Sequence, residues 1–131
     1  SRPDLRDRRQ ARPVSEPMIP DLDLKRVQNW MAQQNLDIPA RARDQVRYEI
    51  DVTDRTITLL ECRPPWNEDL GAEWIRFPIC RFRYTKTSST WSLYWRDRNL
   101  KFHKYELAAP TPHLDELIEE VKRDPTAIFW G

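Results

Sequence analysis

Basic and aromatic side chains alternate with apolar ones along several segments of this chain. A strand turns successive side chains to opposite faces of a sheet, so such alternation collects every second residue on one surface. Guanidinium groups hold phosphates and tyrosine rings stack on bases, so a surface of this kind is typical of proteins that bind nucleic acid. The candidate binding residues of this face are Arg47, Arg81, Arg83, Tyr94, Arg96, Lys101, His103 and Tyr105.

An ordinary solvated sheet face gives the same alternation, because antiparallel sheets commonly keep one side in water. Glu49 and Asp51 are expected on this face too, and their charges weaken its positive field. A further candidate is Trp66, which follows Pro64 and Pro65. Proline does not fit a central strand, so this run predicts a loop. We expect Trp66 to be partly exposed there, either as an anchor for a partner or as a lid on the core.

A nuclease-like pattern is the first catalytic alternative. Asp51 followed by Glu61 and Arg63 distantly resembles the two acids and the lysine with which some nucleases hold Mg²⁺ and position a water. Arginine replaces the lysine here and stays protonated, which makes it a poor proton-transfer group. The alternation also puts Asp51 and Glu61 on opposite faces of the sheet.

Acid–base or nucleophilic catalysis around His103, with Cys80, Asp97 or Glu106 as partner, is the second alternative. A single histidine opposite a tyrosine on a neighbouring strand more often forms a cross-strand contact. With only two glycines, the chain has no phosphate-binding loop and no nucleophile elbow. Enzymatic activity stays open, but the sequence favours a non-enzymatic role.

Composition narrows the class of protein. The 131 residues include 22 basic and 21 acidic ones, a net charge of +1, so an argument for nucleic acid depends on where the charges sit. Cys62 and Cys80 lack metal-ligand spacing and are expected as free buried thiols, and we expect no metal or cofactor. No apolar run reaches the roughly 18–20 residues of a membrane span and no signal peptide opens the chain. We therefore expect a cytoplasmic protein without membrane contact.

Residues 1–20 form a separate region in this interpretation. They carry five arginines and four prolines and almost no apolar side chains, so they cannot bury enough surface to offset their ordering entropy. We expect a basic, Pro-rich disordered tail over 1–20 and a single domain over 21–131. The arginines of the tail would suit an anionic partner.

The elements of the domain follow from periodicity. Helical spacing predicts a helix over 22–34 with Asp21 as its N-cap, and a second one that Thr111 caps and Pro112 begins. Alternation predicts strands over 46–52, 57–63, 74–84, 91–96 and 100–105, with a bend at Pro78. The predicted fold is α+β, with an antiparallel sheet of about five strands in two hairpin-like units and both helices packed on one face. The apolar C-terminal residues 127–131 are expected to dock on the core.

The turn before the last strand sets a register. A two-residue turn at Arg98-Asn99 places Trp95 opposite Phe102 and Tyr94 opposite His103. In this register Trp91, Leu93, Trp95 and Phe102 are buried on the helix side, while Tyr94, Arg96, Lys101 and His103 lie on the other side.

Several short segments of the sequence resemble a bacterial family, common in actinobacteria, known as domain of unknown function 3024. They are 46–49 (VRYE), 61–66 (ECRPPW), 81–84 (RFRY), 91–97 (WSLYWRD), 124–125 (DP) and 129–131 (FWG). In order, they cover about residues 22–131. The resemblance implies no established activity and no catalytic residue, and the tail lies outside it.

Together these patterns favour a non-enzymatic binding or adaptor module. The leading partner is nucleic acid or a nucleoprotein, bound by the Arg/Tyr face of the sheet. The alternative is a protein-interaction or homodimerisation module that uses the same face or Trp66. A hydrolase or nuclease ranks third.

Overall fold

A computed structural model describes residues 19–65 and 73–130 of the chain. The strands are β1 (Arg47–Thr53), β2 (Thr56–Arg63), β3 (Ile75–Thr85), β4 (Thr90–Arg96) and β5 (Phe102–Lys104). Within these residues they form one antiparallel sheet in the order β1-β2-β3-β4-β5. Two α-helices, α2 (Asp21–Leu36) and α3 (Leu114–Arg123), and a short 3-10 turn (Ala40–Ala42) complete the described part. The predicted α+β fold class is confirmed.

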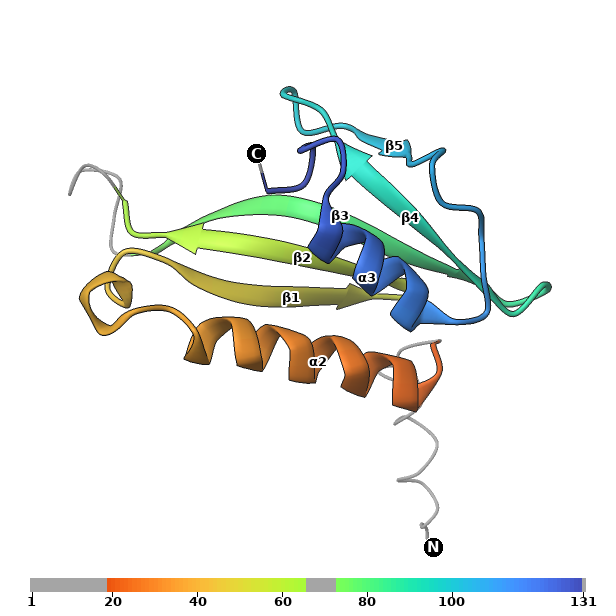
Figure 1. Cartoon of the computed structure of the whole chain (residues 1–131), viewed down its shortest axis with the longest axis horizontal. Coiled ribbons are helices and arrows are strands. Elements are labelled where there is room, and N and C mark those ends of the chain that lie inside the picture. The colour runs from red at the N-terminus through yellow and green to blue at the C-terminus, as the bar shows by residue number, and fades with distance from the viewer. Residues whose placement is uncertain (1–18, 66–72, 131) are drawn as a thin grey trace, which may run out of the picture.

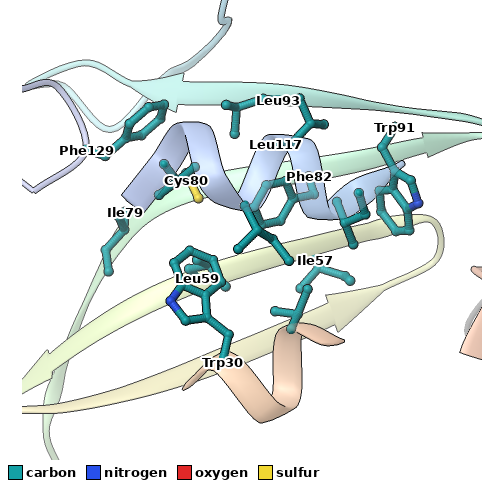
Figure 2. Close-up of a cluster of buried hydrophobic side chains, with 14 of the residues drawn as sticks. Trp30, Ile57, Leu59, Ile79, Cys80, Phe82, Trp91, Leu93, Leu117 and Phe129 are labelled. Carbon is teal, nitrogen blue, oxygen red and sulfur yellow. The ribbon is translucent and has the colours of Figure 1, made fainter. Parts of the chain in front are cut away.

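Both helices pack on the same face of the sheet, which we call the helix side (Figure 1). The alternating apolar residues of the strands point to this side, as Ile57, Leu59 and Phe82 do, and are fully buried. Figure 2 shows them meeting Trp30 of α2 and Leu117 of α3 in one continuous cluster. The opposite face, which we call the outer face, is covered by neither helix of the described residues.

The helix ends differ from the prediction. α2 begins at Asp21 with Pro20 at the capping position, one residue earlier than expected. α3 begins at Leu114, two residues later than expected, with His113 preceding it and no side-chain cap. Thr111 instead pairs with Trp91 of β4 through two backbone hydrogen bonds of 2.7 and 3.0 Å. The helix therefore begins only after the residue that pairs with β4.

The outer edge of β1 is closed by a side chain. The Asn35 amide donates to the carbonyl of Tyr48 at 2.9 Å and accepts from its N–H at 2.8 Å. These two bonds reproduce those of a neighbouring strand, so this part of the edge cannot pair with another chain.

The predicted register between the last two strands is wrong by one residue. Trp95 pairs with His103 and Arg96 with Phe102. The turn contains three residues, because Leu100 adopts a left-handed conformation (φ 66°) and the Asp97 N–H bonds the Lys101 carbonyl. Phe102 consequently lies on the outer face, and His103 lies on the helix side beside the Trp95 ring, with centroids 4.9 Å apart.

The Asp97 side chain explains this turn. Its Oδ1 accepts the N–H groups of Asn99 at 2.8 Å and Lys101 at 3.0 Å. An aspartate that bonds the backbone two residues on stabilises a turn locally, and a three-residue loop with one left-handed residue is a common hairpin connection. The pattern of hydrophobic residues alone could not reveal the hydrogen bonds that the Asp97 carboxylate accepts.

A bulge in β3 changes which residues share the outer face. Thr58 pairs with Arg81, but Leu60 pairs with Pro78, so the pairing skips one residue of β3. Ile79 is the extra residue and is buried. Beyond the bulge the alternation reverses, and Arg76, opposite Cys62, joins the face that Arg81 occupies. In place of the bend expected at Pro78, the structure has a bulge, and this bulge changes which side chains of β3 point to each face.

The C-terminal segment docks on the core, as predicted. Asp124 has a left-handed backbone (φ 44°), and its carboxylate accepts the N–H groups of Phe129 at 3.1 Å and Trp130 at 2.9 Å. The Trp130 indole donates to the Val121 carbonyl at 2.8 Å and packs edge-on against Trp30. Phe129 is buried.

The expected tail, apart from its last two residues, and Trp66 lie outside the described residues. Ile19 belongs to the hydrophobic core, so the folded part includes residues ahead of the predicted boundary at 21. Cys62 and Cys80 are free and buried, as expected. Neither helix in the described part is long and apolar enough to cross a membrane.

Candidate functional site

The strands present more positive than negative charge on the outer face. Two acidic residues, Glu49 and Asp51, lie there. The basic residues of the described strands on this face are Arg47, Arg76, Arg81, Arg83, Arg96 and Lys104. The excess is four positive charges, whereas the whole chain carries +1. The two helices on the helix side together have six acidic and four basic residues. Charge is therefore segregated between the two sides of the sheet.

Arg81 occupies the centre of the outer face. It forms a row with Thr58, Tyr94 and Lys104 across four neighbouring strands. Its Nε donates to the Thr58 hydroxyl at 3.0 Å, and its guanidinium carbon lies 3.9 Å from the centre of the Phe102 ring. These contacts fix the guanidinium plane while the side chain stays half-buried. A fixed arginine fork is well suited to a phosphate, because little side-chain entropy is lost on binding.

The next row places Arg83 opposite Thr56 and Ser92. Arg83 is exposed and lines a hollow of about 170 Å³ at the β1–β2 turn together with Arg55. Within the described residues, the Nε of Arg55 is buried without a hydrogen-bond partner. Two arginines and one acidic residue, Asp54, thus line this end of the face.

A larger cavity of about 400 Å³ lies at the other end of the outer face, and we call it the Trp74 pocket. Its lining consists of Arg47, Glu49, Glu73, Trp74 and Arg76. The guanidinium carbon of Arg47 lies 4.2 Å from the centre of the Trp74 ring. Glu49 accepts from Arg47 at 3.0 Å and approaches Arg76 at 3.5 Å.

Cys62 pairs with both Arg47 and Arg76 in the strand ladder and is fully buried beneath this group. Burial raises the pKa of its thiol, the nearby Glu49 charge adds to the rise, and the two arginines oppose it. Because its pKa is raised rather than lowered, Cys62 lacks the thiolate character that a nucleophile needs.

Four of the predicted binding residues lie on the outer face with side chains that reach solvent: Arg47, Arg81, Arg83 and Tyr94. Arg96 is on this face too, but its guanidinium donates to the carbonyls of Pro78 at 2.5 Å and Asp97 at 3.3 Å. It therefore fastens β4 to the bulged part of β3.

Lys101, His103 and Tyr105 do not belong to the outer face, and the prediction is wrong for them. Lys101 closes the turn before β5. His103 lies beside Trp95, where its Nε2 is 2.8 Å from Oδ2 of Asp97 and this contact keeps the pKa of Asp97 low. The one-residue shift of register carries all three away from their expected positions.

Tyr105 is buried under α3 and donates to Glu120 at 2.6 Å. Burial, together with the bond to Glu120, raises the pKa of Tyr105 to about 12. Arg123 pairs with the same carboxylate, so Glu120 is compensated although it is buried. This group holds α3 on the sheet, and the Tyr105 side chain is too buried to contact a ligand.

The nuclease hypothesis does not fit the geometry. Asp51 lies on the outer face opposite Thr58, whereas Glu61 lies on the helix side opposite Tyr48 and pairs with Arg63 at 2.7 Å. The two carboxylates are on opposite faces, as the alternation predicted, so they cannot hold one metal ion between them.

One further cavity, of about 370 Å³, lies where β3 extends beyond β4. Phe77, Phe129 and Trp130 form its aromatic walls, and Arg63 and Arg96 stand at its polar side. Phe77 is 38% exposed. This cavity is separate from the Trp74 pocket.

The comparison with family models gives a match over residues 14–131, to the family described as Domain of unknown function (DUF3024). The chain belongs to this family. The comparisons with curated proteins and with solved structures found no match to the chain. The match begins before residue 22, where the resemblance seen in the sequence begins, and so takes in part of the segment predicted as a tail.

In this DUF3024 domain the short segments that carried the resemblance serve two purposes. Asp124, Phe129 and Trp130 close the C-terminus on the core through the bonds described above. Arg81 and Tyr94 instead lie side by side on the outer face. The same motifs thus contain both structural residues and the central candidates for binding.

Sequence reasoning missed four residues of the outer face: Trp74, Arg76, Phe102 and Lys104. Arg76 joins the face because of the bulge next to Pro78, and a proline within a strand was the available signal. Phe102 and Lys104 join it because the turn at Asp97 contains three residues. In each case a local irregularity shifted the alternation by one residue.

Proposed function

We propose that this domain binds single-stranded nucleic acid on the outer face of its sheet. The observation that carries the proposal is the segregation of charge, because the positive excess lies on the one sheet face that neither described helix covers. Phosphates supply most of the affinity in such complexes and are held by arginine and lysine.

Aromatic side chains favour a single strand over a duplex. Trp74, Tyr94 and Phe102 are half-buried around the basic residues of the outer face. Bases that are not paired in a duplex can stack on such rings, and each stacked base contributes about 1–3 kcal/mol. A duplex hides its bases, so the rings would add little to its binding. An open sheet face also offers an extended strand room to lie across several strands.

The proposal is tested by fluorescence-anisotropy titration of single- and double-stranded RNA and DNA. The variant Arg81→Gln/Arg83→Gln removes two charges from the outer face. The control Lys25→Gln/Arg41→Gln removes two exposed charges from α2 and the 3-10 turn. We expect single strands to bind more tightly than duplexes, and only the first variant to weaken binding.

Two results would contradict the proposal. One is the absence of binding to every nucleic acid below about 10⁻⁴ M, the weak limit of ordinary non-specific association. The other is an equal loss of affinity in both double variants, which would indicate a general charge effect. Either result would leave the protein-interaction alternative as the leading hypothesis.

A further inference from the structure

The Trp74 pocket contains a mixture of groups that a plain phosphate site does not need. Two guanidinium groups, two carboxylates and one indole line a cavity of about 400 Å³. This cavity is open to solvent, and its lining is mostly polar. Carboxylates repel phosphate, so their presence indicates a ligand that also offers hydrogen-bond donors.

The two carboxylates differ in how they are used. Glu49 lies between Arg47 and Arg76 and pairs with both. Glu73 is exposed, and within residues 19–65 and 73–130 its carboxylate has no ion pair and no side-chain hydrogen bond. Among the described residues, Glu73 is therefore the carboxylate of the pocket without a basic partner, and an ionised carboxylate only accepts hydrogen bonds.

Trp74 offers a flat partner beside Glu73. Arg47 fixes the indole from one side, with 4.2 Å between the guanidinium carbon and the ring centre. A nucleobase that stacks on Trp74 would turn its polar edge toward the neighbouring carboxylate. Arg76 would then be near the sugar–phosphate part of the same nucleotide.

The hydrogen bonds that a carboxylate accepts select one base. Guanine presents two adjacent donors on its pairing edge, the N1–H and the N2 amino group, which match the two oxygens of a carboxylate. Adenine and cytosine each present one amino group beside an acceptor nitrogen, and uracil presents one N–H between two carbonyl oxygens. Acceptor atoms of those bases would face the negative charge of Glu73.

We propose that the Trp74 pocket is a guanine subsite, in which Trp74 stacks on the base and Glu73 accepts from its N1–H and N2 amino groups. This inference rests on the proposed function, and it adds base selectivity to a surface that otherwise recognises phosphates. Arg76 neutralises the phosphate of the bound nucleotide, and Glu49 keeps the two arginines in place.

The test uses a fluorescently labelled oligouridine RNA in which one central position is uracil, adenine, hypoxanthine or guanine. We expect guanine to bind about tenfold more tightly than uracil or adenine, the size typical of a two-bond contact with one base. Hypoxanthine keeps the N1–H and lacks the amino group, so its affinity should fall between them. The Glu73→Gln variant should bring guanine close to the level of uracil.

The matched control is Glu106→Gln, which removes another exposed carboxylate outside the pocket. It should keep the full preference for guanine. Equal affinity for all four RNAs, or a guanine preference that Glu73→Gln leaves intact, would overturn the guanine subsite while the proposed function stands. If none of the four RNAs binds, the proposed function fails and the subsite fails with it.

Discussion

The two sides of the sheet use the same residue types in different ways. On the helix side, polar groups of aromatic residues are bonded into the fold: the Trp91 indole donates to Asp23 at 2.9 Å, and Tyr105 donates to Glu120. On the outer face, guanidinium groups rest on the rings of Trp74 and Phe102, and the side chains remain partly exposed. The first arrangement stabilises the fold, whereas the second leaves charge available to a partner.

This difference separates the aromatic residues that stabilise the fold from those proposed to bind a partner. The polar groups of buried Trp91 and Tyr105 are bonded to specific acceptors, as those of tyrosine and tryptophan generally are in cores. The Trp74 and Phe102 rings of the outer face are contacted by arginines, which are themselves able to bind phosphates. The following predictions test whether the two sides differ as strongly as this account requires.

The largest effect is expected from a pair of substitutions on one strand. Trp91→Ala should lower the free energy of unfolding by about 3–5 kcal/mol, since it empties a fully buried site and removes the bond to Asp23. Tyr94→Ala, on the outer face of the same β4, should cost less than half as much. Urea denaturation of both variants measures the difference, and equal losses would break the distinction between the sides.

The buried tyrosine predicts an alkaline loss of stability. Burial, with the bond to Glu120, raises the folded-state pKa of Tyr105 from 10.0 to about 12. A group with a raised folded pKa contributes stability that is complete below its unfolded pKa and is lost as pH rises. Stability should therefore fall between pH 10 and about pH 12.

Tyr105→Phe is the variant that isolates this effect, because it lacks the ionising hydroxyl. Thermal unfolding measured across that pH range should decline less steeply in Tyr105→Phe than in the wild type. Parallel pH profiles for the two proteins would show that Tyr105 is not held by the helix side as described.

The smallest effect concerns the turn that sets the register of β5. Leu100 has a left-handed backbone, which disfavours every residue with a Cβ, and its side chain is 52% exposed. Leu100→Gly should therefore raise the free energy of unfolding by about 0.5–1 kcal/mol. A clear destabilisation in chemical denaturation would contradict the three-residue turn, and with it the position of Phe102 on the outer face.

Much of the fold could be predicted from periodicity. Alternation placed Trp91, Leu93 and Trp95 on the helix side, where the structure has them, because the side chains of a strand alternate with a period of two. The apolar C-terminus predicted docking, and the Asp124 carboxylate shows how the chain achieves it. These features depend on the hydrophobicity of many residues together, and the sequence shows that pattern directly.

The candidate site was predicted less well, because it depends on single local events. One extra residue at Ile79 brings Arg76 onto the outer face, and one left-handed residue at Leu100 exchanges Phe102 for His103. Each event shifts the alternation by one, so the residues before it and the residues after it along the chain alternate in opposite phase. The hydrogen bonds that the Asp97 carboxylate accepts stabilise the three-residue turn. They decide the register of β5 against the one that the hydrophobic pattern favours.

The central claim is that Arg81 and Arg83 contact phosphates on the outer face, and the salt dependence of binding tests it most directly. For single strands, the plot of log affinity against log salt loses about 0.7 units of slope with each phosphate contact removed. We predict that Arg81→Gln/Arg83→Gln has a slope smaller by roughly 1.4 than the wild type. The Lys25→Gln/Arg41→Gln control should keep the wild-type slope. An unchanged slope in the outer-face variant, or the same reduction in both variants, would contradict the account.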